Sequence, residues 1–259
     1  MSKLYDPIKR HLAIEKLVTK ENFSKKLRKY YRFRADRWYG GIATADAVGC
    51  GLLCKFCWTS DKVLYRPNDV GDFYEPKDVA LRLIKIAEIK NFSQIRISGG
   101  EPTIGKDHLL NLLNILEGFE GYTFILETNG ILIGNDPNYA KELSKYRFIH
   151  VRVSLKGCNE EEFTTLTGAK PEGFQLQLRA LKNLIDMNVK CHPAVMISFS
   201  HQNNFKELVK RIEKIDSKLA NNIEIEELIL YGKVAERLKK YNLKPITSYQ
   251  PDKIPNELI

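Results

Sequence analysis

The chain has 259 residues, of which 43% are hydrophobic, and a formal net charge of +9. A chain of this length can bury a substantial core, and α/β barrels of about this size commonly form one domain. It has no uninterrupted apolar run of roughly 18 residues, and charges are spread through its first residues, so we expect neither a membrane-spanning helix nor a signal peptide. Five cysteines do not resemble a secreted disulfide framework, so we expect a cytoplasmic protein whose thiols serve metal or redox chemistry.

Positive charge is concentrated at the two ends of the chain. Residues 1–37 hold twelve Lys and Arg against four Asp and Glu, and residues 231–259 hold six against three. Asp6 and Pro7 predict the start of a helix, and residues 23–33 are expected to continue as a second basic helix. We therefore divide the chain into a basic helical N-terminal extension (1–41), a core domain (42–230) and a C-terminal tail (231–259), whose last part we expect to be irregular.

Strand-like and helical segments alternate through the core domain. Strands are predicted over residues 40–48, 93–100, 122–130, 147–157, 189–200 and 223–231. Helices are predicted over residues 75–90, 106–118, 138–146, 174–188 and 204–215, with Pro76 opening the first and Asp107 as the candidate N-cap of the second. Six strands that alternate with helices predict a parallel sheet, which right-handed crossovers would curl into a partial or full barrel.

The segment "CGLLCKFCWTS" places Cys50, Cys54 and Cys57 in the loop after the first predicted strand. In a parallel barrel this loop lies on the C-terminal face, where active sites are built. A closed structural zinc site takes four ligands, and no His or Cys lies close enough in sequence to supply a fourth one. Cysteines that serve only as small apolar residues usually occur singly. The spacing therefore favours an iron–sulfur cluster held by three thiolates, with one iron that lacks a protein ligand.

The pattern C-x3-C-x-aromatic-C, formed by Cys50, Cys54, Phe56 and Cys57, resembles the signature of the radical S-adenosylmethionine (SAM) enzymes. The resemblance covers about residues 42–230 and implies a partial (βα)6 TIM-type barrel that binds one [4Fe-4S] cluster and SAM. In that family SAM chelates the open iron, an electron from the cluster cleaves SAM reductively, and the resulting 5′-deoxyadenosyl radical abstracts a hydrogen atom from the substrate. The protein orients these cofactors and excludes competing reactions.

Three further segments at predicted strand ends extend this resemblance. "SGGEP" follows the second strand, and the family's GGE motif implies that its residues hold the SAM amino group: Ser98, Gly99, Gly100 and Glu101. "ETNG" and "SLKG" are similar to segments of the glycyl-radical-enzyme activating enzymes. That likeness implies that residues of both segments lie near the SAM carboxylate or ribose, in part through a monovalent cation: Glu127, Thr128, Asn129, Ser154 and Lys156. The chain departs from the subgroup's pattern where Glu127 replaces Asp and Ser154 replaces a carboxylate.

A weaker likeness concerns residues 38–58, which resemble the corresponding part of the wyosine-forming tRNA enzymes. Those enzymes carry additional cysteines for a second cluster, whereas this chain has only Cys158 and Cys191 besides the first three. Because Cys191 lies early in its predicted strand, toward the opposite face of the barrel, we do not expect a second cluster. Cys158 follows "SLKG" and is a candidate catalytic residue that would donate a hydrogen atom or meet a substrate radical; a lone cysteine is more often inert packing.

The substrate and partners follow less directly from the sequence. Residues 25–41 interleave Lys and Arg with Tyr, Phe and Trp, which suits nucleic acid but equally a basic helix packed on the barrel. We expect a macromolecular substrate, tRNA or protein, with a small molecule as the alternative, and a one-electron donor of ferredoxin or flavodoxin type. A hypothesis of another class is a non-catalytic iron–sulfur electron-transfer protein. The five histidines show no metal-ligand spacing and are expected to be structural.

Overall fold

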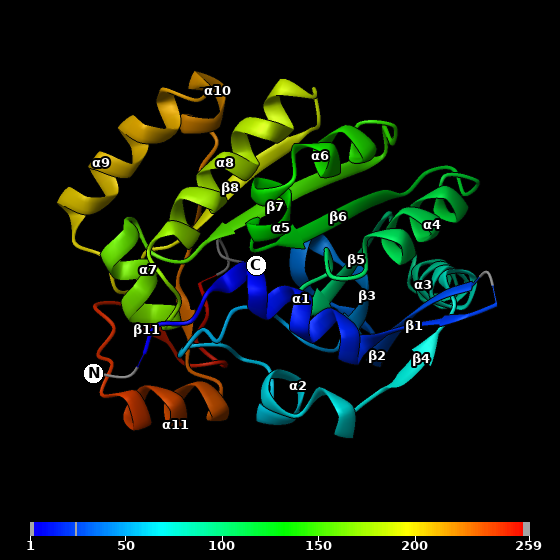
Figure 1. Cartoon of the computed structure of the whole chain (residues 1–259), viewed down its shortest axis with the longest axis horizontal. Helices are drawn as coiled ribbons and strands as arrows, with labels where there is room; N and C mark the ends of the chain where they lie inside the picture. The colour runs from blue at the N-terminus through cyan, green and yellow to red at the C-terminus, as the bar shows by residue number, and fades with distance from the viewer. Residues whose placement is uncertain (1–2, 24, 256–259) are drawn as a thin grey trace.

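Parallel strands form the centre of the fold in this computed structural model, which describes residues 3–23 and 25–255. Within these residues, six strands run parallel in the order β3-β5-β6-β7-β8-β9, as the alternating pattern predicted. Their bounds are Ile42–Ala47 (β3), Gln94–Gly99 (β5), Thr123–Thr128 (β6), Ile149–Leu155 (β7), Cys191–Met196 (β8) and Glu224–Glu226 (β9). The sheet curves, with helices on its outer side (Figure 1). The partial (βα)6 barrel is thereby confirmed.

The helices between these strands pack their apolar residues on the outer face of the sheet. Their bounds are Pro76–Lys90 (α3), Lys106–Leu116 (α4), Ile131–Asn135 (α5), Pro137–Leu143 (α6), Glu160–Thr167 (α7), Glu172–Asp186 (α8), Gln202–Glu213 (α9) and Ser217–Ala220 (α10). Pro76 opens α3 as predicted. The expected N-cap Asp107 is wrong: Gly105, with φ 82°, takes that position, and Asp107 lies in the first turn. Glycine adopts this left-handed conformation with little strain because it has no Cβ atom, which explains why Gly105 stands at this position.

The N-terminal segment begins with the predicted helix but continues as strands. Helix α1 spans Pro7–Val18, and the Asp6 carboxylate caps it by accepting from the Ile8 N–H at 2.9 Å. The second basic helix is wrong, because residues Lys25–Asp36 form strand β2. It pairs antiparallel with β3 and also with two short strands, β1 (Thr19–Asn22) and β4 (Asp72–Tyr74). The open edge of β3 decides this conformation, since pairing and burial override weak local preference.

A buried arginine fixes β2 to the barrel. The Arg28 side chain is 1% exposed and donates to the carbonyl oxygens of Val48 at 2.7 Å, Ile104 at 2.9 Å and Glu101 at 3.3 Å. Such donations compensate a guanidinium for the water that it loses on burial. The segment before residue 42 is therefore part of the same sheet, and the domain boundaries drawn above remain a prediction.

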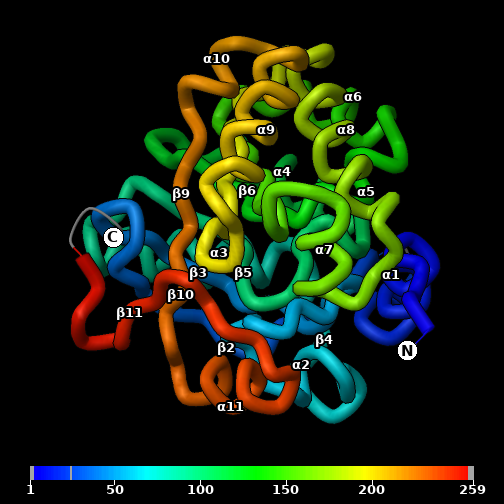
Figure 2. Tube along the Cα trace, turned by 90° about the vertical axis from the view of Figure 1, so that its left-hand side faces the viewer, coloured from blue at the N-terminus to red at the C-terminus, as the bar shows by residue number. Residues whose placement is uncertain are grey.

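The C-terminal part is more ordered than expected. The single strand predicted over 223–231 is two strands, β9 and β10 (Leu228–Ile229), and helix α11 (Gly232–Tyr241) follows them. In the segment expected to be irregular, β11 (Ser248–Tyr249) pairs parallel with β10. Short elements complete the chain: α2 (Asp61–Tyr65) and two 3-10 turns, Trp38–Gly40 and Pro67–Asp69. Helices α2 and α11 lie near one another in both views (Figures 1 and 2).

The two faces of the sheet differ in polarity. Outward-facing residues of the central strands are apolar and buried under the helices: Ile95, Ile97, Phe124, Leu126, Val151, Val153 and Val195. Alternate residues point into the lumen and are largely polar, as the period of two in a strand requires. Across the described part of the chain, no helix has the length and apolar character needed to cross a membrane.

Candidate active site

The three clustered thiols lie on the loop that leaves the C-terminal end of β3. Cys50 Sγ accepts from the Leu52 N–H at 3.4 Å and from the Asn129 amide at 3.6 Å, and Cys57 Sγ lies 3.0 Å from Thr59 Oγ1. Iron–sulfur ligand thiolates accept hydrogen bonds of this kind, which help to set the cluster potential. Among the described residues, no three His, Cys, Asp or Glu side chains are grouped so that they could hold one metal ion. Three thiolates are the donor set that a [4Fe-4S] cluster takes when one of its irons has no protein ligand.

Burial keeps two of these thiols, those of Cys50 and Cys54, protonated in the protein alone. It raises the pKa of Cys54 to about 12, although the nearby Lys156 ammonium acts in the opposite direction. Burial likewise raises the pKa of Cys50, and the charges of Glu101 and Cys54 add to that effect. A coordinating thiol loses its proton to the charge of the metal. The loop thus suits thiols that ionise only when they bind a cation-rich group.

Helix α1 supports the thiol loop from one side. His11 is fully buried; its Nδ1 donates to the Pro7 carbonyl at 2.7 Å, so its Nε2 accepts from the Asn129 amide at 3.1 Å. Burial lowers the pKa of His11, which keeps the ring neutral for this role. Its ring lies against Gly51, where a Cβ atom would overlap it. His11 therefore orients the same Asn129 amide that contacts the Cys50 sulfur.

Three further segments hold the loop from other directions: helix α7, the residues around Tyr5, and helix α11. The Lys55 N–H donates to the Leu166 carbonyl of α7 at 2.8 Å, and the Leu53 N–H donates to the Tyr5 hydroxyl at 2.8 Å. From α11, the Arg237 guanidinium donates to the carbonyl oxygens of Cys57 and, at 2.7 Å, of Thr59. The loop that carries the thiols is thus fastened by segments from both ends of the chain.

The "SGGEP" turn joins this loop to the next strand ends. The Gly100 N–H donates to the Ala47 carbonyl at 2.8 Å, and the Glu101 N–H donates to the Gly49 carbonyl at 2.9 Å. A side chain at Gly100 would collide with the Gly49 carbonyl, which explains the glycine. The turn therefore packs directly on the start of the thiol loop.

The Glu101 carboxylate connects that turn to the "ETNG" segment. It is 2% exposed and accepts from Thr103 Oγ1 and Thr128 Oγ1, both at 2.6 Å, and from the Asn129 N–H at 2.8 Å. The predicted SAM residues Glu101, Thr128 and Asn129 are thus brought together. Their polar atoms bond to one another, which gives the GGE carboxylate an organising role in this structure.

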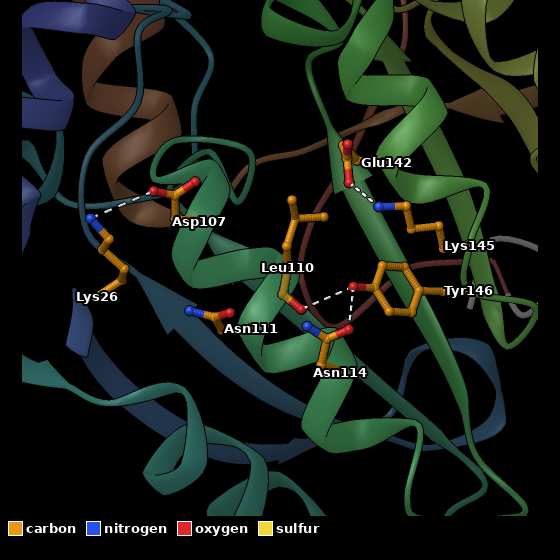
Figure 3. A pocket seen from close by; sticks show the side chains of 8 residues that line it. All are labelled: Lys26, Asp107, Leu110, Asn111, Asn114, Glu142, Lys145 and Tyr146. Carbon is orange, nitrogen blue, oxygen red and sulfur yellow. Dashed lines mark hydrogen bonds and ion pairs between the residues drawn. The ribbon is translucent and has the colours of Figure 1, made fainter. Parts of the chain in front are cut away.

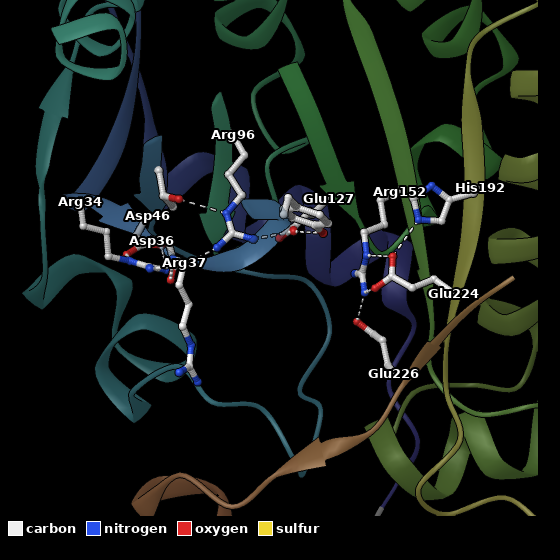
Figure 4. A network of polar contacts seen from close by, with 12 residues as sticks. Arg34, Asp36, Arg37, Asp46, Arg96, Glu127, Arg152, His192, Glu224 and Glu226 are labelled. Carbon is white, nitrogen blue, oxygen red and sulfur yellow. Dashed lines mark hydrogen bonds and ion pairs between the residues drawn. The ribbon is translucent and has the colours of Figure 1, made fainter. Parts of the chain in front are cut away.

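Charged side chains line the lumen in a row from β2 to β9 (Figure 4). Arg96 donates to Asp36 at 2.6 Å and to Glu127 at 2.7 Å, and Tyr39 also donates to Glu127 at 2.7 Å. Burial opposes the ionisation of Glu127, but the charges of Arg96 and Arg152 outweigh it and lower its pKa. Glu127 therefore already has a cationic partner, where the sequence suggested a monovalent cation.

The second half of the row surrounds Arg152. This arginine donates to both Glu224 oxygens, at 2.6 and 2.8 Å, and to Glu226 at 2.8 Å. Burial opposes the ionisation of Glu224, but the bonds from Arg152 and His192 outweigh it and lower its pKa to about 2. Ser154 donates to Glu226 at 2.9 Å, and Lys156 donates to Ser154. The predicted pair Ser154 and Lys156 thus ends this network at the thiol loop.

Other predicted residues lie at the margins of the site. Phe56 packs on Phe199 with 5.6 Å between ring centroids, and Ser98 is 9% exposed at the end of β5 next to Gly99. Cys158 is 1% exposed, and burial raises its pKa to about 11, although the nearby Ser200 acts in the opposite direction. Its catalytic role stays a prediction. Cys191 begins β8, at the opposite end of the sheet from Cys158.

Four of the five histidines form side-chain contacts within the fold: His11, described above, His108, His150 and His192. His108 lies between Tyr30 and the Lys26 carbonyl, and His150 bonds to His192 at 2.6 Å, which in turn bonds to Glu224.

A pocket of about 330 Å³ lies away from these residues, between α4 and α6 (Figure 3). Its polar groups are largely paired: Tyr146 donates to Asn114 at 2.6 Å, and Lys145 bonds to Glu142 at 2.6 Å. No thiol and no lumen residue lines it, so it carries no part of the site.

Sequence reasoning missed the lumen charges and the supports of the loop. Arg96 and Arg152 are single charges inside apolar strands, and Glu224 and Glu226 alternate on β9. Because side chains alternate between the two faces of a strand, the sequence identifies the positions that point into the barrel. A charged residue at such a position would have indicated a lumen residue. His11 and Arg237 offered no local signal, because their partners lie far away in the sequence.

The family comparison covers most of the barrel. The chain matches the model of the radical SAM superfamily over residues 46–212. It is similar to a probable GTP 3′,8-cyclase of Saccharolobus islandicus, with 27% identity over 192 residues that make up 72% of this chain and 56% of the relative. The chain thus spans little more than half the length of this curated relative.

Solved structures share the fold at low identity. Streptococcus suis SuiB bound to S-adenosylmethionine gives a TM-score of 0.56 at 20% identity, covering 81% of this chain and 45% of SuiB. SuiB bound to precursor peptide SuiA gives 0.56 at 22% identity, covering 70% and 37%. TYW1 with a lysine-pyruvate adduct bound gives 0.51 at 14% identity, covering 93% and 90%. The likeness to these proteins is one of fold.

Proposed function

Because the chain belongs to the radical SAM superfamily, we propose that it cleaves SAM reductively and abstracts a hydrogen atom from a polar substrate bound in the barrel lumen. The observation that carries the proposal is the thiol loop, fastened at the mouth of a partial barrel whose lumen is lined by charge. The superfamily implies a [4Fe-4S] cluster and SAM. When bound, these groups supply the electron and the carbon radical that the reaction needs.

This chain's residues would bind and orient those groups. Cys50, Cys54 and Cys57 would hold the cluster, and Asn129 would fix the Cys50 sulfur through its amide. Gly99 and Gly100 would let the turn lie directly on the start of the thiol loop, because a side chain at either position would crowd the backbone of Ala47 or Gly49. Lys156 offers a cation beside the loop, where a carboxylate is favourable in a water-poor site.

The lumen supports a substrate that carries charge. Buried ion pairs add little net stability compared with apolar packing, so a lumen that keeps Arg96, Arg152, Glu127 and Glu226 is better explained by recognition of a polar ligand. The relatives fit this view, since one is named for GTP and another is bound to a peptide.

A tRNA substrate has less support from the structure than from the sequence. Lys29 is 6% exposed and donates to the carbonyls of Pro67 and Asn68, and the exposed Lys25 pairs with Glu75 at 2.7 Å. With Arg28 also buried, few cations of this segment are free to neutralise phosphates. We therefore place a small polar molecule or a peptide side chain ahead of tRNA.

The test is SAM cleavage under anaerobic conditions with a strong chemical reductant. We expect slow formation of 5′-deoxyadenosine without substrate and a clear increase with the correct one among GTP, peptide and tRNA fractions. A non-catalytic electron-transfer protein would bind iron and form no 5′-deoxyadenosine. That outcome would refute the proposed reaction.

A further inference from the structure

A basic surface lies on the outer side of the thiol loop. Residues 52–66 and 232–244 hold eight Lys or Arg against two Asp or Glu, a net charge of +6 out of +9 for the chain. The two segments are joined by Arg237, which donates to Asp61 at 2.5 Å. Helices α2 and α11 carry most of these charges and lie together in Figure 2. Two thirds of the net charge is therefore gathered beside one loop.

Exposed aromatic rings lie among these charges. Tyr65 is 41% exposed and Tyr241 is 36% exposed, and the two phenol groups lie close enough to interact. The ammonium groups of Lys55 and Lys240 each lie 5.5 Å from the Tyr241 ring centroid. Within residues 3–23 and 25–255, neither Lys62 nor Lys240 forms an ion pair. Aromatic rings with a charged rim are typical of protein interfaces.

This surface is close to the thiols and separate from the lumen. Lys55 directly follows Cys54, and Arg237 holds the Cys57 carbonyl. On the other side of the loop, Cys54 is within electrostatic reach of Lys156 and Glu226, which belong to the lumen. A protein that docks on the outer surface would therefore approach the thiols without entering the substrate space.

We propose that Lys55, Lys62, Tyr65, Lys240 and Tyr241 form the docking surface for an acidic one-electron donor protein of flavodoxin or ferredoxin type. The inference rests on the proposed function, because only a reducible group on the loop needs such a donor. In the step that docking serves, the donor is oxidised by one electron and the iron–sulfur group is reduced by the same electron. Positive charge steers a negative partner to the surface and raises its rate of association.

The test compares two charge-reversal variants of the reconstituted protein. Lys62→Glu with Lys240→Glu changes the docking surface, and Lys85→Glu with Lys90→Glu makes the same change in net charge on exposed positions of α3. The rate of reduction is followed by stopped-flow absorbance, once with a reduced acidic flavodoxin and once with dithionite. We expect the first variant to be reduced about tenfold more slowly by flavodoxin at low ionic strength, with dithionite reduction unchanged.

Other outcomes contradict the inference in distinguishable ways. Equal flavodoxin rates in both variants would overturn it, as would a loss of total tRNA binding with flavodoxin reduction intact, which would assign the surface to nucleic acid. Failure of the parent protein to bind iron would instead refute the proposed function, and the docking proposal with it.

Discussion

A single guanidinium, that of Arg237, holds the thiol loop from 180 positions further along the chain. It is 5% exposed and bonds to two loop carbonyls and to Asp61. Its charge also lies close enough to Cys57 to interact with that sulfur. A buried carbonyl that loses its donor keeps the full free-energy cost of its desolvation. We therefore expect this one side chain to stabilise the folded loop.

We predict that Arg237→Gln lowers the iron bound per chain after anaerobic reconstitution and reduces the free energy of unfolding by about 2 kcal/mol. Lys239→Gln, an exposed change on the same helix, is the matched control. Iron analysis and urea unfolding measure the two effects. Iron content and stability equal to those of the control would show that Arg237 does not hold the loop.

Strand β2 is an element whose conformation the local sequence does not determine. Its Lys, Arg and Leu residues suit a helix, and its aromatic residues suit a strand, so local preference does not decide. The outcome depends on the edge of β3 and on buried partners for Arg28 and Tyr30. His108 of α4 provides one of these partners, because it accepts from the Tyr30 hydroxyl at 3.0 Å and donates to the Lys26 carbonyl at 2.8 Å.

This contact predicts a pH dependence of stability. Burial lowers the pKa of His108 to about 4 from its usual 6.5, so the folded protein keeps the ring neutral where the unfolded chain takes up a proton. The contribution of His108 to the free energy of unfolding is complete above about pH 6.5. As the pH falls toward 4 this contribution is lost, by roughly 3 kcal/mol for a pKa shift of this size. His108→Gln should flatten this part of the stability curve in urea unfolding, whereas the exposed His201→Gln should not. Equal slopes for both variants would contradict it.

At the scale of the whole molecule, the hydrophobic pattern of the sequence was sufficient to predict the barrel. It was not sufficient to predict the charged side chains that line the lumen. Alternating apolar segments identified the parallel strands, and strand order placed the thiols and "SGGEP" at neighbouring strand ends. The ion pairs Arg96–Glu127 and Arg152–Glu226 join residues 31 and 74 positions apart, so no local window contains them. The hydrogen bonds by which His11 and Arg237 support the thiol loop join residues that lie even further apart in the sequence.

The central claim is that the thiol loop holds an iron–sulfur cluster that binds SAM, and anaerobic reconstitution tests it most directly. Iron analysis should give about four iron atoms per chain, and the electron paramagnetic resonance spectrum of the reduced protein should change when SAM is added. Cys50→Ala, Cys54→Ala and Cys57→Ala should each abolish the cluster, while Cys191→Ala should retain it. Zinc in place of iron, or a reduced spectrum that SAM leaves unchanged, would contradict the account.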